Sequence, residues 1–237
     1  MKISIVTAAW QRHDLFKFFC EYWNNITPEI HLDLYCAVSE KETERIAKQN
    51  NFRTIFVSNE PLAVKWNTIC SYASLRNPDY CIFIGSDDII NRSLMNKYIG
   101  EMKKGTDYIS CLDWYFINTA DKQLIYWRGY QEQYRKGHPC GAGRALSKNI
   151  LKKINYQPWA YPGYDHILDT GFDKKLSQLT FSKKSFMMEG DEMGLDIKTS
   201  VNMTPYKQWN NTKQEHFIKL EKSFGKETTQ KIFSLKY

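Results

Sequence analysis

The chain has 237 residues, a mass of 28.0 kDa and a formal net charge of +7. Its 42% hydrophobic and 25% charged residues exclude a disordered chain and are typical of one globular domain. The opening MKISIVTAAW lacks the pattern of a signal peptide, and no apolar run approaches the ~20 residues of a membrane span. We therefore expect a cytoplasmic protein, in which the six cysteines, without any C-x-x-C pair, are buried free thiols.

The first hundred residues alternate between short apolar runs and amphipathic segments. Strands are predicted at 2–8, 32–38, 52–58 and 80–85, and helices at 13–23, 40–50, 62–73 and 93–103. This alternation predicts βαβ units around a mostly parallel central sheet flanked by helices, that is, an α/β fold.

After Gly105 the alternation ends. Strands are predicted at 107–118, 123–130 and 179–182, and helices at 147–154, 164–176 and 212–224. We therefore expect a single domain over 1–237, with a nucleotide-binding half (1–105) and a mixed α+β half (106–237).

Positive charge gathers near the C-terminus. Residues 198–237 carry eight lysines and three glutamates, a net charge of +5. Such a segment could face nucleic acid, an anionic membrane surface or a charged glycan, although a solvated amphipathic helix is the more ordinary explanation. Peripheral contact with a membrane is thus left open.

The stretch YCIFIGSDDII, residues 80–90, places Asp87 and Asp88 directly after an apolar strand. Open α/β sheets bind ligands at the carboxyl ends of their strands. The two acids could instead cap the next helix, but Asn91 lies closer to the start of that helical pattern. Because a carboxylate pair binds Mg²⁺ or Mn²⁺ together with substrate phosphates, we predict a divalent cation at Asp87 and Asp88.

The motifs SIVTAAWQR, AVSE, EPLAVKWNTIC, FIGSDD, GAGRALS and GYDHILD follow one another over about residues 3–169. In this order they resemble glycosyltransferases of the GT-A fold, close to glycosyltransferase family 2. The resemblance implies an enzyme that moves a sugar, typically a hexose, from a nucleotide diphosphate sugar, most simply a UDP-sugar, to an acceptor hydroxyl. It also implies Mn²⁺ or Mg²⁺ as cofactor.

In that family the fourth strand ends in a D-x-D motif that holds the metal and the donor. Gly85 stands where the first acid is usual, Asp87 matches the second, and Asp88 is an additional acid. The resemblance therefore implies Asp87 as the first choice of metal ligand and Asp88 as the second, with Ser86 facing the ribose or the donor sugar.

The resemblance also assigns donor contacts in the first half. Thr7 and Ala8 lie where the family packs the nucleobase and ribose. The remaining donor residues that it implies are Arg12, Glu40, Lys65 and Asn67. Arg12 could pair with phosphate or with a surface acid, and Glu40 could contact the nucleobase or simply begin a helix.

In the second half the resemblance places Gly141 and Arg144 in a loop beside the donor sugar, although GAGR could equally be a tight turn before a helix capped by Ser147. Lys198 is a candidate contact for the diphosphate. Asp165 lies where the family carries its catalytic acid, and a base there would contribute roughly 10²–10⁴-fold by taking the acceptor proton in an inverting transfer. On a helix it could instead belong to an acidic face.

Two other functions remain open from the sequence. A nucleotidyltransferase that makes sugar nucleotides would need a glycine-rich loop after the first strand, and TAAWQR contains no glycine. A non-catalytic module that binds glycan or nucleic acid would use the basic, aromatic second half. The acceptor of a transferase is equally open between a glycan, a lipid-linked saccharide, a protein and a modified DNA base.

Overall fold

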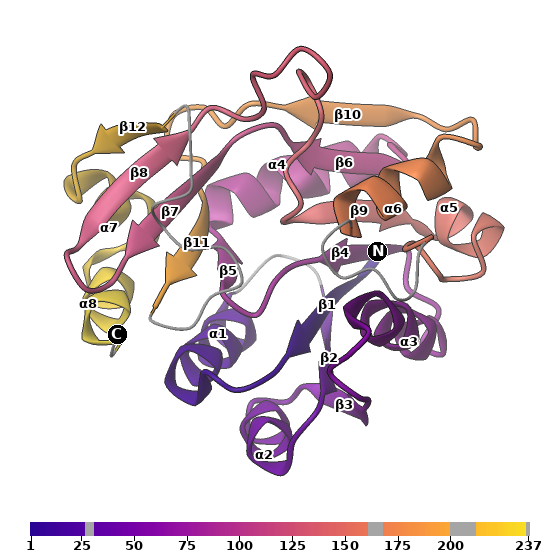
Figure 1. The fold of residues 1–237 in the computed structure, drawn as a ribbon, viewed down its shortest axis with the longest axis horizontal. Coiled ribbons are helices and arrows are strands. Elements are labelled where there is room, and N and C mark those ends of the chain that lie inside the picture. The colour runs from indigo at the N-terminus through magenta and orange to yellow at the C-terminus, as the bar shows by residue number, and fades with distance from the viewer. Residues whose placement is uncertain (27–30, 161–167, 200–211, 236–237) are drawn as a thin grey trace.

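The computed structural model describes residues 1–26, 31–160, 168–199 and 212–235. Within these ranges the strands form two sheets, and helices cover both faces of the larger one (Figure 1). None of the described helices has the length and apolar character that crossing a bilayer requires.

The larger sheet has the strand order β10-β6-β9-β4-β1-β2-β3. β1 pairs in parallel with β2 and β4, and β2 pairs in parallel with β3. β9 runs antiparallel between β4 and β6, and β10 is parallel to β6. The strands are β1 (Lys2–Ala9), β2 (His31–Val38), β3 (Arg53–Phe56), β4 (Tyr80–Phe83), β6 (Tyr108–Cys111), β9 (Arg144–Ser147) and β10 (Lys183–Phe186). This largely parallel sheet confirms the predicted α/β class.

Helices pack on both faces because successive strand residues point to opposite sides. Ile3 and Ile5 of β1 join a core with α1, α2 and α4, whereas Val6 joins a second core with α3, α5 and α6. The helices are α1 (His13–Asn25), α2 (Lys41–Gln49), α3 (Leu62–Ser74), α4 (Arg92–Lys103), α5 (Lys148–Lys153) and α6 (Leu168–Leu176).

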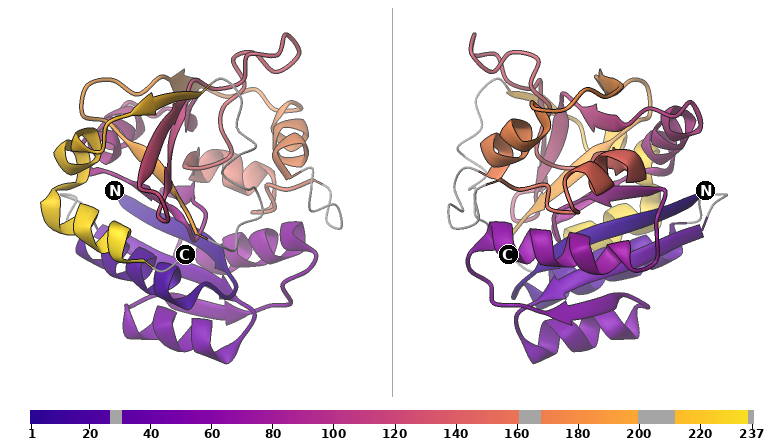
Figure 2. Two further views of the ribbon diagram at one scale, coloured as in Figure 1. Left: turned by 60° about the vertical axis from the view of Figure 1, so that its left-hand side comes forward. Right: turned by 90° about the vertical axis from the view of Figure 1, so that its right-hand side faces the viewer.

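The second sheet has the order β12-β8-β7-β11-β5. Its strands are β5 (Asp88–Ile90), β7 (Trp114–Asn118), β8 (Gln123–Trp127), β11 (Gly194–Lys198) and β12 (Thr212–Glu215), and the yellow helices α7 (Ile218–Phe224) and α8 (Lys226–Ser234) lie on its side of the molecule (Figure 2). Both halves of the chain contribute to both sheets, since β5 precedes Gly105 and β6, β9 and β10 follow it.

The predicted long strand at 107–118 is wrong, because the chain divides there into β6 and β7, which belong to different sheets. Asp113 occupies the break and is fully buried. Its carboxylate accepts hydrogen bonds from the Tyr126 hydroxyl at 2.7 Å and from the Met188 amide at 3.0 Å. These bonds fix the turn that passes the chain from one sheet to the other.

Two further predictions are corrected. The strand expected at 179–182 lies instead at β10, where it pairs with β6. The terminal helix expected at 212–224 begins as strand β12, which pairs with β8, and only then becomes α7. Gly225, at φ 83°, separates α7 from α8. The predicted helix caps are confirmed, since Asn91 and Ser147 accept from the amides of the third residue after them.

Candidate functional site

The predicted acid pair lies at the end of β4, where the chain crosses from the larger sheet to the second sheet. β4 is a run of buried apolar residues. The amide of Asp88 donates to the carbonyl of Gly85 at 3.1 Å, which closes a turn, and Asp88 then begins β5. Asp87 and Asp88 therefore lie at the carboxyl edge of the parallel strands, and the cap of α4 is Asn91 instead.

Arg12 approaches Asp87 from the loop after β1. Its Nη1 atom lies 2.6 Å from Asp87 Oδ2, and its Nη2 atom donates to Ser86 Oγ at 3.0 Å. Burial favours the neutral acid, but the charges of Arg12 and Lys198 outweigh it and hold the pKa of Asp87 below its ordinary value. Asp87 is therefore a carboxylate at neutral pH.

Asp88 lies deeper than its neighbour and is only 7% exposed. The indole Nε1 of Trp114 donates to Asp88 Oδ1 at 3.1 Å. Burial, followed by the charges of Asp196 and Asp87, raises the pKa of Asp88 well above its ordinary value. A cation beside Asp88 would favour its ionised form.

β11 adds a third acid and a lysine. It runs antiparallel to β5 and places Asp196 opposite Asp88, and Lys198 Nζ lies 2.6 Å from Asp196 Oδ2. Burial raises the pKa of Asp196 to about 6, against the opposing charge of Lys198. The sequence predicts Lys198 here but does not single out Asp196. The sequence could have pointed to Asp196, because it lies two residues before Lys198 and alternate residues of a strand share a face.

These five side chains, Arg12, Asp87, Asp88, Asp196 and Lys198, are called the acidic cluster below. Gly85 provides a test of whether a divalent cation fits it. A Cβ atom on Gly85 would lie 2.5 Å from Asp88 Oδ2 and 2.9 Å from Asp87 Oδ1, the oxygens opposite those that contact Trp114 and Arg12.

Both oxygens thus converge on the space left by the missing side chain. Mg²⁺ and Mn²⁺ bind through one or two carboxylates and complete their coordination with water and phosphate, so the pair fits such an ion. Across the described ranges no three His, Cys, Asp or Glu side chains are arranged as a metal site. Ions of this kind typically complete their coordination with water and substrate phosphate oxygens.

Lys65 and Asn67 are two of the residues predicted to contact the sugar donor, and both form hydrogen bonds with other parts of the chain. Lys65 Nζ donates to the Ala9 carbonyl at 2.7 Å and to Asn59 Oδ1 at 3.1 Å. The side chain is buried, and burial lowers the pKa of Lys65 to about 8. Asn67 exchanges two hydrogen bonds of 3.0 Å with the backbone of Trp159. Their roles toward a donor stay predictions.

The end of β1 carries one residue that the sequence does not single out. Thr7 is buried, Ala8 is half-buried, and Trp10, directly after the strand, is 45% exposed. An exposed indole beside Arg12 offers an apolar face and one N–H to a ligand. The sequence could have pointed to Trp10, because it directly follows a predicted strand within the motif SIVTAAWQR.

Glu40 caps α2 but does not bond to the amides of that helix. Its Oε1 atom instead accepts from the Gln11 amide at 2.8 Å and from the Thr43 hydroxyl at 2.6 Å, and it lies 2.7 Å from His13 Nε2. Of these three partners, Gln11 lies in the loop that carries Arg12, and His13 begins α1 directly after it.

Arg144 begins β9, where it pairs with Phe83 of β4, and its side chain is 3% exposed. Its guanidinium lies 3.3 Å from Asp169 and 3.8 Å from Asp173, and it donates to the Cys140 carbonyl at 3.0 Å. A Cβ on Gly141 would come within 2.8 Å of Asp169 Oδ1, so the loop packs closely on α6. Asp165 lies outside the described residues.

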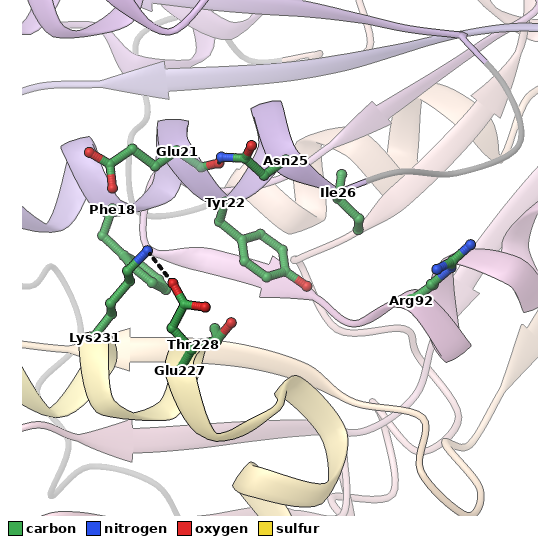
Figure 3. Close-up of a pocket in the computed structure, with 9 residues that line it drawn as sticks. All are labelled: Phe18, Glu21, Tyr22, Asn25, Ile26, Arg92, Glu227, Thr228 and Lys231. Carbon is green, nitrogen blue, oxygen red and sulfur yellow. Dashed lines mark hydrogen bonds and ion pairs between the residues drawn. The ribbon is translucent and has the colours of Figure 1, made fainter.

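A cavity of about 570 Å³ lies between α1 and α8 (Figure 3). Figure 3 shows Phe18 and Tyr22 on the α1 side and Glu227 and Lys231 on the α8 side. None of the residues that line it is a predicted site residue. It is therefore a separate feature from the strand edge described above.

Comparisons with known proteins define the fold. No protein-family model matches the chain, and no curated protein sequence matches it significantly. Among solved structures, a fragment of S. aureus TarS is similar, with a TM-score of 0.61 and 12% identity over 83% of this chain and 60% of that one. The chain spans 36% of a longer TarS structure.

Two further structures are similar. Glucosyl-3-phosphoglycerate synthase from Mycobacterium tuberculosis, in complex with Mn²⁺, UDP and glucosyl-3-phosphoglycerate, has a TM-score of 0.54 and 15% identity over 78% of this chain and 69% of that one. CMP:2-keto-3-deoxy-manno-octonic acid synthetase, complexed with CTP, has a TM-score of 0.52 and 10% identity over 80% and 91%. These likenesses establish a GT-A-like fold, as the sequence predicts.

Proposed function

We propose that this chain is a glycosyltransferase that transfers a sugar from a nucleotide diphosphate sugar, most simply a UDP-sugar, to an acceptor hydroxyl. The observation that carries the proposal is the convergence of Asp87 and Asp88 over Gly85 at the carboxyl edge of a GT-A-like sheet. Structures of two similar proteins contain UDP-GlcNAc (TarS) and UDP with Mn²⁺ (the phosphoglycerate synthase), which supports the choice of donor.

We propose Asp87 and Asp88 as the residues that hold Mn²⁺ or Mg²⁺. Such an ion supplies Lewis-acid stabilisation of the charge on the leaving diphosphate, worth several kcal/mol. Arg12 and Lys198 balance the acids and orient them, and Ser86 faces the ribose or donor sugar. Thr7, Ala8, Lys65, Asn67, Gly141 and Arg144 are the remaining proposed donor-side residues.

The transfer itself forms a bond between the acceptor oxygen and the anomeric carbon and breaks the bond from that carbon to the diphosphate. Asp165 is proposed as the base that takes the hydroxyl proton, so that the acceptor oxygen attacks the anomeric carbon from the face opposite the diphosphate and its configuration inverts. The acceptor class stays open between a glycan, a lipid-linked saccharide, a protein and a modified DNA base. Steeply salt-dependent binding to duplex DNA would favour the last.

A second candidate is a nucleotidyltransferase, because CMP:2-keto-3-deoxy-manno-octonic acid synthetase is matched over 91% of its length. The two activities release different products. A glycosyltransferase releases nucleoside diphosphate from a nucleotide sugar, whereas a nucleotidyltransferase releases pyrophosphate from a nucleoside triphosphate and a sugar substrate. Assaying both products with the same preparation separates them.

The test is a screen of nucleotide sugars for Mn²⁺- or Mg²⁺-dependent release of nucleoside diphosphate. Asp87→Asn is expected to lower the rate by about 10²–10³-fold, since it weakens the cation site on which charge stabilisation depends. Asp121→Asn is a matched control, because Asp121 lies in a turn and bonds only locally to the Gln123 amide among the described contacts. An unchanged rate in Asp87→Asn would overturn the metal role.

A further inference from the structure

The loop between β1 and α1 holds an unusual backbone conformation. Gln11 has φ 56° and Arg12 has φ 50°. Two consecutive non-glycine residues in the left-handed region are costly, because the Cβ of each crowds its own backbone. Such a turn persists only where its surroundings hold it, and turns of this kind occur often at functional sites.

The turn delivers a specific side chain. From it the Arg12 guanidinium reaches Asp87 at 2.6 Å and Ser86 at 3.0 Å, two residues at the end of β4. The Arg12 carbonyl meanwhile accepts from the Phe16 amide at 2.8 Å and starts α1. The direction of the guanidinium therefore depends on a backbone shape that the local sequence disfavours.

Glu40 holds this turn on both sides of Arg12. Its Oε1 atom accepts from the Gln11 amide, one residue before, and contacts His13 Nε2, one residue after. The Thr43 hydroxyl, at 2.6 Å, fixes the same oxygen from the first turn of α2. One carboxylate oxygen thus joins the ends of β1 and β2 around the residue that contacts Asp87.

We propose that Glu40 is a positioning residue that fixes the left-handed turn at Gln11 and Arg12 and so holds the Arg12 guanidinium against Asp87. It acts on the acidic cluster through Arg12 and not by contact with the nucleobase. The consequence for sugar transfer rests on the proposed function, but the positioning itself does not.

The first experiment measures positioning without any assay of transfer. Phenylglyoxal modifies accessible guanidinium groups, and peptide mass spectrometry reports the rate at Arg12. Glu40→Ala is expected to raise that rate about tenfold, because the released turn withdraws Arg12 from Asp87. Glu42→Ala is the matched control, since Glu42 lies on the same helix and pairs with Arg45 at 2.6 Å. Equal Arg12 rates in the wild-type chain and Glu40→Ala would overturn the proposal.

The second experiment is a double-mutant cycle on nucleotide-sugar turnover. Glu40→Ala is expected to lower kcat/KM about tenfold in the wild-type background and under about twofold in the Arg12→Ala background. Glu40→Gln, which keeps an acceptor oxygen, is expected to restore most of the loss. An equal loss in both backgrounds would show that Glu40 acts independently of Arg12. If the chain transfers no sugar, the labelling result still decides the positioning role.

Discussion

Among the described residues, the acidic cluster and a second group of arginine and aspartate side chains differ in how much of each faces solvent. In the acidic cluster, Arg12 and Asp87 are 18% and 17% exposed. In the other, called the Arg144 cluster, Arg144 is 3% exposed, while its partners Asp169 and Asp173 are 39% and 32% exposed. The arginine side chain is thus partly exposed to solvent in the acidic cluster and almost fully buried in the Arg144 cluster.

Their remaining contacts follow the same division. The Arg144 guanidinium donates to the Cys140 carbonyl and lies 4.7 Å from the centre of the Phe172 ring, so it joins a loop to α6. In the acidic cluster, one oxygen of Asp87 and one of Asp88 instead approach the space that a side chain on Gly85 would fill. The same residue types therefore form a structural ion pair in one place and a candidate ligand site in the other. What distinguishes them is that Asp87 and Asp88 each keep one carboxylate oxygen directed toward the space beside Gly85.

Arg144→Met should have the largest effect on stability. Removing one partner of a buried ion pair costs about 3–5 kcal/mol, and we expect the lower end because water can solvate the two aspartates. A loss of about 3 kcal/mol corresponds to about 6–12 °C in Tm for a chain of this size. Circular dichroism measures the change. A variant with wild-type Tm but without turnover would show that Arg144 serves the donor alone and that its buried ion pairs do not stabilise the fold.

Lys65 sharpens the comparison because a buried lysine, unlike an arginine, can release its proton. The pKa of Lys65 is about 8 in the fold and 10.5 ordinarily. Between these values the unfolded chain holds a proton that the native chain has lost, so this group makes stability rise with pH. The stability difference between the wild-type chain and Lys65→Met should rise by up to about 3 kcal/mol from pH 7.5 to 10.5.

Urea unfolding of both proteins at the two pH values measures this difference. The tyrosines and cysteines that titrate in the same range are present in both proteins and cancel. A difference that does not change with pH would mean that Lys65 keeps its charge in the native chain.

Arg12→Met should affect function more than stability. We expect nucleotide-sugar turnover to fall about 10–30-fold, while the unfolding free energy changes by about 1 kcal/mol, because the pair is partly exposed. Turnover assays and thermal unfolding of the same preparation measure both quantities. If Arg12→Met lost as much unfolding free energy as Arg144→Met, the acidic cluster would have a structural role instead.

Gly85→Ala should have the smallest effect. Its methyl group would displace the Asp88 and Asp87 carboxylates, which lie within 2.5 and 2.9 Å of the new atom, and lower Mn²⁺ affinity about tenfold. Calorimetry with Mn²⁺ alone measures it. Gly100→Ala is the control, because nothing lies within 4 Å of that Cβ on α4. It should leave Mn²⁺ binding unchanged and stabilise the helix by up to about 1 kcal/mol.

The first half of the fold was predictable because its signals are local. Strands β1 to β4 and helices α1 to α4 follow apolar runs and helical stripes, and Asn91 caps α4 within three residues of its partner. The short strand β5 was not predicted, because its pairing partner, β11, lies about 100 residues further along the chain. The second half was less so. The run 107–118 is mostly apolar and therefore predicts one strand. Asp113 divides it through hydrogen bonds to Tyr126 and Met188, and the local sequence does not predict these distant partners.

The sequence by itself determined where the acids lie, because an apolar strand that ends in Gly85, Ser86, Asp87 and Asp88 delivers them to the binding edge of an α/β sheet. Only the tertiary structure decided what surrounds them. Arg12 meets Asp87 across 75 residues, and Asp196 faces Asp88 through strand pairing. The reason is physical: hydrophobic periodicity is a property of neighbouring residues, whereas charge pairing and burial depend on which distant segments pack together.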